Sequence, residues 1–108
     1  MSDEIYEQSL LEAAQEGDIE AYEELQILLE PDIRRFVQRK INDPYTVDDV
    51  IQEVFLAFYQ NMYRINPVEN LRPYIFRIAR NKCYDDLRKF QRNENVSLDD
   101  DPVRTRVS

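Results

Sequence analysis

The residues best suited to chemistry lie in one helix-length segment near the C-terminal end, where aromatic, guanidinium and amide side chains recur at helical spacing. The set is Tyr74, Arg77, Arg80, Asn81, Tyr84, Arg88 and Gln91. Such a stripe suits single-stranded nucleic acid, because bases stack on tyrosine rings, amides read base edges and arginines hold phosphates. The alternative is a half-buried helix whose tyrosines pack against the N-terminal segment and whose arginines pair with its glutamates.

Charge is distributed unevenly along the chain. The formal net charge of −8 would by itself argue against nucleic acid, because an acidic protein repels phosphate at long range. Residues 1–30, however, hold ten acids and no Lys or Arg, whereas residues 71–92 hold seven bases against Asp85 and Asp86. One basic segment therefore lies inside an acidic protein. A solvated helix face is the other explanation for such a segment.

The sequence gives catalysis and metal binding little support. It contains no His and only one cysteine, Cys83, so the commonest general base is absent and a cysteine-based metal site has no second ligand. The carboxylate pairs Asp48/Asp49 and Asp85/Asp86 are adjacent in sequence and therefore diverge around a helix. We expect a protein that is not an enzyme and that has no metal site and no cofactor.

The elements that position these residues are expected to be helices. With 108 residues, one glycine and five prolines, the chain predicts a single all-α domain, a compact bundle of four to five helices. A first short helix is expected from near Ser9 to Gly17, with Asp18 as the cap of the next. Apolar residues at three- and four-residue steps continue to Ile41 across Pro31, which predicts either two helices or one kinked helix.

A third helix is expected to begin near Val47, after a turn at residues 42–45. Thr46, followed by Asp49 three residues later, resembles a capping box. The apolar stripe of this helix should face the core, and it consists of Val47, Val50, Ile51, Val54, Phe55 and Phe58. The residues left toward another side are Asp49, Gln52, Glu53 and Leu56.

The C-terminal third is predicted to hold a loop, a long helix and a tail. Residues 61–70 lack periodicity and predict a loop. Asn70 can cap the last helix, which should run to about Arg92. Its apolar stripe is Leu71, Ile75, Ile78, Ala79, Cys83, Leu87 and Phe90, so Cys83 is interpreted as a small core residue. Residues 93–108 are polar, acidic and unpatterned, as expected of a disordered linker.

Membrane insertion is not expected. No apolar run approaches the roughly 18 to 20 residues that a spanning helix needs, and the N-terminus has no signal character. We expect a soluble, cytoplasmic protein with no membrane partner.

Three stretches, in order, resemble region 2 of the extracytoplasmic-function sigma factors of bacteria. The first is Gly17-Asp18 with Ala21-Tyr22, similar to the family's Gly-Asp-x-x-Ala-Phe. The second is Asp49-Val50-Ile51-Gln52-Glu53-Val54-Phe55, similar to an aspartate, two apolar residues and Gln-Glu-x-Phe. The third is Arg72-Pro73-Tyr74-Ile75-Phe76-Arg77-Ile78-Ala79-Arg80-Asn81, similar to an aromatic-Leu-Tyr-Arg-Ile-Ala-x-Asn stretch. The resemblance covers roughly residues 5–92 and implies the sigma-70 region 2 fold.

The resemblance implies a polymerase-docking face. In the family, the helix with the Asp-x-x-Gln-Glu motif docks on the clamp helices of the RNA polymerase β′ subunit. The corresponding residues here are Asp49, Gln52, Glu53 and Leu56. Acids and an amide around an apolar residue can pair with arginines of a partner helix. Helix capping is the structural alternative for Asp49.

The resemblance also implies that the loop and the last helix receive the −10 promoter element as single-stranded non-template DNA, with one flipped base in a loop pocket. The candidate loop residues are Asn61, Arg64, Ile65 and Asn66. On the helix they are Tyr74, Arg77, Asn81 and Tyr84, with Asn81 as the best candidate for base reading. The remaining bases are phosphate contacts or ordinary solvated residues, namely Arg72, Arg80, Lys82, Arg88, Lys89 and Arg92.

The chain departs from the family pattern at two positions. Ile65 stands where the family often has Phe, and Tyr74 stands where Trp is common. An isoleucine cannot supply the same stacking, which bears on the geometry and sequence preference of the pocket.

Residues 1–92 are predicted to form the region 2 domain and residues 93–108 to begin the linker toward a helix-turn-helix domain, region 4, which this sequence lacks. An anti-sigma factor is a further possible partner. The competing hypothesis is a sigma-like decoy or adaptor that binds an anti-sigma factor without touching DNA. A decoy would be expected to lose the basic and aromatic surface of the last helix, and this chain keeps it.

Overall fold

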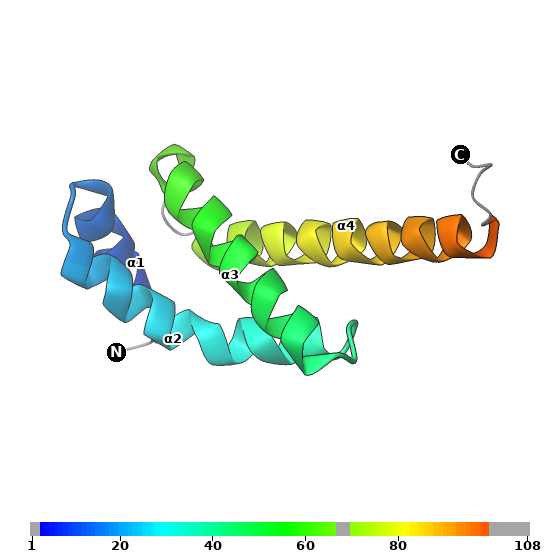
Figure 1. Ribbon diagram of the computed structural model, residues 1–108. Coiled ribbons are helices and arrows are strands. Elements are labelled where there is room, and N and C mark those ends of the chain that lie inside the picture. Colours follow the sequence, from blue (N-terminus) through cyan, green and yellow to red (C-terminus); the bar gives the residue numbers. More distant parts are fainter. Residues whose placement is uncertain (1–2, 67–69, 100–108) are drawn as a thin grey trace.

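The computed structural model describes residues 3–66 and 70–99, with side chains described for residues 4–66 and 70–89. These residues form four α-helices and one 3-10 helix, without a strand, which confirms the predicted all-α class. In chain order they are α1 (Asp3–Gln15), α2 (Ile19–Gln38), α3 (Pro44–Asn61), η1 (Met62–Arg64) and α4 (Leu71–Asp99) (Figure 1).

The turn between α1 and α2 has the predicted residues. Gly17 adopts a φ of 103°, a left-handed conformation that costs glycine little. The Asp18 carboxylate then accepts a hydrogen bond from the backbone N–H of Ala21 (3.1 Å) and caps α2. The first helix nevertheless begins at Asp3 rather than near Ser9, because Tyr6 and Glu7 bond to side chains of α2 and α4.

Pro31 lies inside α2, which is a single helix from Ile19 to Gln38. The proline is exposed, so water can hydrate the backbone carbonyl left free one turn earlier by the missing N–H. Apolar residues on both sides of Pro31 are fully buried along one stripe, and they are Leu25, Leu29, Ile33 and Val37. Packing of this stripe outweighs the local cost of the proline.

Helix α3 begins earlier than predicted. It starts at Pro44, so the predicted turn at residues 42–45 and the cap at Thr46 are wrong. The cap is Asp43, whose carboxylate accepts hydrogen bonds from the Thr46 backbone N–H (3.0 Å) and hydroxyl (2.6 Å). These bonds lower the pKa of Asp43. Pro44 suits the first helical position because its fixed φ is helical and its absent N–H would have no partner there.

Part of the loop predicted at residues 61–70 is helical. Residues Met62–Arg64 form η1, and both Met62 and Ile65 are buried. Helix α4 begins directly after Asn70, the predicted cap, and extends to Asp99. The predicted end near Arg92 is wrong, because residues 93–99 contain no glycine or proline to stop a helix. Residues 100–108 lie outside the described part of the chain, and the domain boundary stays a prediction.

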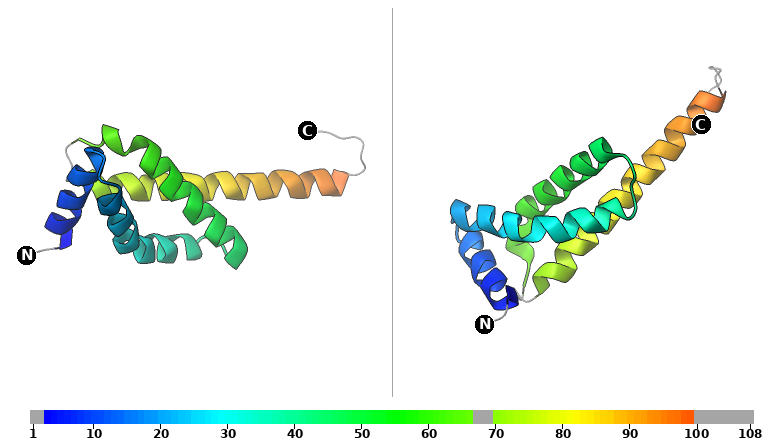
Figure 2. Two further views of the ribbon diagram at one scale, coloured as in Figure 1. Left: turned by 60° about the vertical axis from the view of Figure 1, so that its left-hand side comes forward. Right: turned by 90° about the horizontal axis from the view of Figure 1, so that it is seen from below.

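The core lies where the helical stripes meet. All six predicted stripe residues of α3 are buried. On α4, Leu71, Ile75, Ala79 and Cys83 are buried, Ile78 is half-buried, and Leu87 is 38% exposed. Burial declines because the C-terminal half of α4 extends beyond the other helices (Figure 2). The side chain of Phe90, the last predicted stripe residue, lies outside the described side chains.

Cys83 is the predicted core residue. Its side chain has no exposed surface and belongs to the same cluster as Ile75 and Ala79. Burial raises the pKa of its thiol, against the opposing effect of the Lys40 ammonium. No helix within residues 3–66 and 70–99 is long and apolar enough to cross a membrane.

Candidate functional site

The loop and the first turns of α4 together form a pocket of about 280 Å³. The residues that line it are Arg64, Ile65, Asn66, Asn70, Pro73, Tyr74 and Arg77. Five of the predicted DNA-binding residues are therefore brought together, three from the segment that follows α3 and two from α4. Asn70 and Pro73 complete the lining.

Ile65 lies at the inner side of this pocket. It is 4% exposed and belongs to the hydrophobic core, so only a small part of its side chain reaches the pocket. Its backbone carbonyl accepts a hydrogen bond from Nε2 of Gln15 (3.2 Å), which also donates to the carbonyl of Met62 (2.8 Å). Gln15 thus fixes the loop from the end of α1. Sequence reasoning missed Gln15, because nothing in the spacing of a single polar residue indicates a distant backbone partner.

Asn61 lies apart from the pocket. It is the last residue of α3, is half-buried, and donates from Nδ2 to the carbonyl of Ala57 (2.9 Å). Its predicted contact with DNA stays a prediction.

The predicted stripe on α4 covers one broad side of the helix, with differences in exposure along it. Tyr74 is half-buried against the core, while Arg77, Asn81 and Tyr84 follow at steps of three, four and three residues and are exposed. Arg80 lies one turn before Tyr84 on the same side of α4, and it joins Phe36, Phe76 and Arg77 around a second pocket. Arg88 follows Tyr84 by four residues on the same side, and its guanidinium pairs with Asp85.

Arg72 pairs with the N-terminal segment, as the alternative interpretation of the α4 arginines predicts. Its Nε and Nη2 atoms donate to the two carboxylate oxygens of Glu7 (3.0 and 2.7 Å), and Nη1 donates to Asp32 (2.8 Å). Glu7 is only 4% exposed. Hydrogen bonds with Glu7 raise the pKa of Arg72, and the hydrogen bond from Arg72 lowers the pKa of Asp32. Arg72 is therefore a structural residue that joins three helices.

Arg77 and Arg80 differ from Arg72 in this respect. Both are exposed, and neither makes an ion pair with an acidic side chain in the part of the chain where side chains are described. Their charges are available to an external ligand. Pairing with the N-terminal segment therefore accounts for Arg72 but not for Arg77 and Arg80.

The predicted docking face on α3 is exposed at all four positions, Asp49, Gln52, Glu53 and Leu56. Leu56 is 57% exposed, so its apolar side chain is accessible to a partner. Asp49 follows the first turn of α3 and is not its cap, so the capping alternative for this residue is wrong.

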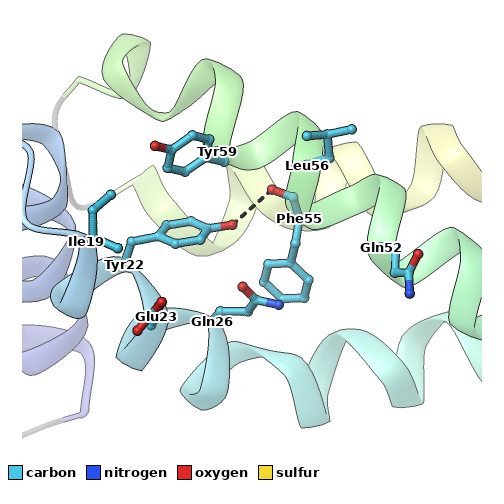
Figure 3. Close-up of a pocket in the computed structure, with 8 residues that line it drawn as sticks. All are labelled: Ile19, Tyr22, Glu23, Gln26, Gln52, Phe55, Leu56 and Tyr59. Carbon is cyan, nitrogen blue, oxygen red and sulfur yellow. Dashed lines mark hydrogen bonds between the residues drawn. The ribbon is translucent and has the colours of Figure 1, made fainter.

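A groove of about 440 Å³ lies beside Leu56, between α2 and α3 (Figure 3). Its lining is Ile19, Tyr22, Glu23, Gln26, Gln52, Phe55, Leu56 and Tyr59. The Tyr22 hydroxyl donates to the carbonyl of Phe55 (3.0 Å), and burial raises the pKa of Tyr22 to about 12. Tyr22 and Tyr59 meet edge to face with 4.9 Å between ring centroids. These contacts hold the walls of the groove in place.

No group of three or more His, Cys, Asp or Glu side chains among the described residues is arranged to hold a metal ion.

Comparisons with known proteins agree with the fold of this chain. A solved structure described as an engineered region 2 of sigmaE in complex with GTAAAA superimposes with a TM-score of 0.76. It is 27% identical in sequence, and the match covers 86% of this chain and 97% of that one.

A curated relative, the ECF RNA polymerase sigma factor SigM of Bacillus subtilis (strain 168), is 28% identical over 68 residues. The match covers 63% of this chain and spans 41% of the relative's length. The family model for sigma-70 region 2 matches residues 25–93, more than half of the sequence. This chain therefore belongs to the sigma-70 region 2 family.

Proposed function

We propose that this chain is the polymerase-docking and promoter-binding part of a sigma factor of the extracytoplasmic-function class, acting in the bacterial cytoplasm. In this proposal the α3 face binds the clamp helices of the polymerase β′ subunit. The loop and α4 bind the −10 element as single-stranded non-template DNA. Membership of the sigma-70 region 2 family and the likeness to an extracytoplasmic-function factor support the general assignment.

The observation that carries the DNA-binding part is the loop pocket. Arg64 and Arg77 bring two guanidinium groups to a pocket that also has the Tyr74 ring and the amides of Asn66 and Asn70 in its lining. Guanidinium groups, amides and an aromatic ring are the groups that hold an extruded base and its phosphate. The solved relative that superimposes on this chain is itself a complex with GTAAAA.

The free-energy cost of extruding a base is similar in size to the gain from stacking it on an aromatic ring. Extruding a base costs a few kcal/mol of unstacking, and stacking on an aromatic side chain recovers about 1 to 3 kcal/mol per base. Tyr74 and Tyr84 supply two rings on one face of α4, and Asn81 lies between them with its amide exposed. A bound polymerase supplies further stabilisation, so we expect this domain alone to bind weakly.

The docking part rests on the α3 face. Leu56 presents an apolar side chain, and Asp49, Gln52 and Glu53 add two acids and an amide on the preceding turns of the same exposed face. Such a face complements a helix that carries arginines around an apolar position, and charge complementarity raises the association rate and sets the register.

The test is titration of the purified chain into polymerase core enzyme and, separately, into fluorescent single-stranded oligonucleotides that include GTAAAA and scrambled versions of it. We expect Glu53→Lys to abolish core binding, because it reverses one of the two negative charges of the face. Asn81→Ala should remove the preference between oligonucleotides while leaving core binding intact. Glu12→Lys, at an exposed position on α1, is the matched charge-reversal control.

Each other outcome has a meaning. Tight core binding without any sequence preference, even with core and DNA present together, would favour the adaptor that binds an anti-sigma factor instead. Absence of core binding would contradict the proposal as a whole.

A further inference from the structure

A second pocket lies between α2 and the N-terminal part of α4. Its volume is about 310 Å³, and its lining is Phe36, Pro73, Phe76, Arg77 and Arg80. Three of these residues are apolar and two are exposed arginines. Neither the family resemblance nor the comparisons assign a role to this pocket.

The second pocket adjoins the loop pocket. Pro73 and Arg77 line both of them, so the two pockets meet along one turn of α4. An extended ligand that occupies the loop pocket therefore reaches the second pocket by passing Arg77. Arg77, which the two pockets share, makes no ion pair with any of the described side chains.

The chemistry of the second pocket suits an unpaired nucleotide. Phe36 and Phe76 meet edge to face, with ring centroids 5.4 Å apart and planes at 79°. Both rings are only partly buried. The ammonium of Lys40 lies 4.9 Å from the centroid of the Phe36 ring and adds a positive charge beside that ring. Partly exposed aromatic rings among cations are the arrangement by which proteins bind single strands.

We propose that this pocket is a second nucleotide subsite, which takes an unpaired base of the same strand next to the base held in the loop pocket. The base stacks on the Phe36/Phe76 pair, and Arg77 and Arg80 hold the phosphates on either side of it. The proposal rests on the proposed function, because the strand must already occupy the loop pocket. It gives a role to Arg80, which is exposed and makes no ion pair with a described side chain.

The probes for the test are the hexanucleotide GTAAAA and the same strand extended with thymidines at its 5′ or 3′ end. Binding to the full chain is followed by fluorescence anisotropy at several salt concentrations. A 2-aminopurine placed at successive positions reports stacking through loss of its fluorescence. The variants are Arg80→Gln, Phe76→Leu and the control Lys89→Gln, with thermal unfolding of each to detect damage to the fold.

Lys89→Gln is a matched control because it removes the same charge from the same helix. Lys89 is exposed and lies nine residues after Arg80, which at about 100° per residue places it on the opposite side of α4. A general effect of net charge would affect both variants equally.

We expect one extended strand to bind wild type more tightly than the hexanucleotide and to show two positions of 2-aminopurine quenching. Arg80→Gln should weaken binding of that strand about five- to tenfold and reduce the salt slope by about one, with little change for Lys89→Gln. Phe76→Leu should restore fluorescence at only one of the two quenched positions. Because Arg80→Gln alters an exposed side chain, its result stands even if Phe76→Leu unfolds.

Equal effects of Arg80→Gln and Lys89→Gln, or a single quenched position in every strand, would overturn the second subsite. The proposed function would survive that result if Asn81→Ala still removed the sequence preference. Failure of wild type to bind any of these strands, with or without polymerase core, would overturn both.

Discussion

Two nitrogens of Arg72, at the start of α4, bond to both carboxylate oxygens of Glu7 in α1, at 3.0 and 2.7 Å. Glu7 lies outside residues 25–93, the part of the chain that the sigma-70 region 2 family model matches. The pair therefore attaches the N-terminal helix to the turn of α4 that carries Pro73 and Tyr74. It connects the stability of the fold to the geometry of the loop pocket.

Glu7→Gln is expected to lower the free energy of unfolding by about 1–3 kcal/mol, because it removes one of the two carboxylates that pair with a partly buried guanidinium. Urea unfolding at pH 7 measures the change. Glu12→Gln, at an exposed position of the same helix, should change stability very little. A loss of the same size in both variants would mean that the pair adds nothing specific.

Asp32→Asn is expected to flatten the loss of stability in acid. The hydrogen bond from Arg72 lowers the pKa of Asp32 below its ordinary 3.8. Its contribution is therefore fully present above the unfolded-state pKa and is lost as the pH falls through the lower folded-state pKa. Urea unfolding from pH 7 down to about pH 3 should show a shallower decline in Asp32→Asn, whereas Asp49→Asn should follow wild type. Parallel curves for wild type and Asp32→Asn would contradict this assignment.

Gly17→Ala is expected to destabilise the protein by about 1 kcal/mol, since the φ of 103° is strained for any residue with a Cβ atom. A Cβ added at Gly17 would meet no atom within 4 Å, so the cost comes from the backbone alone. Gly17→Asn should cost less, because asparagine tolerates left-handed conformations better. Thermal unfolding distinguishes the two variants, and equal losses would point to a cause other than φ.

Cys83 is expected to react very slowly with a thiol reagent in the native protein. Its side chain has no exposed surface, and burial raises the pKa of the thiol, so little reactive thiolate is present at pH 8. The rate, followed by absorbance, should rise sharply in denaturing urea. Tyr45→Cys in a Cys83→Ala background provides an exposed thiol for comparison, at a position that is 80% exposed. Native Cys83 reacting as fast as this thiol would show that α4 opens readily.

Local patterns determined much of this protein. The three- and four-residue spacing of apolar side chains predicted α3 and α4 and their buried stripes, because helical periodicity is a property of neighbouring residues. Gly17 and Asp18 marked the end of one helix and the cap of the next. The ordered motifs around Gln52, Glu53 and Asn81 indicated the family.

The tertiary structure decided which polar side chains meet. Sequence spacing placed both Arg72 and Arg80 on a basic helix. It did not show that Arg72 pairs with Glu7, whereas Arg80 lies beside Phe36 and Phe76 and makes no ion pair with a described side chain. Pro31 likewise left one or two helices possible, and packing of the stripe through Leu29 and Ile33 selected one. The physical reason is that ion pairs and pockets depend on how distant helices cross, which periodicity along a single helix does not specify.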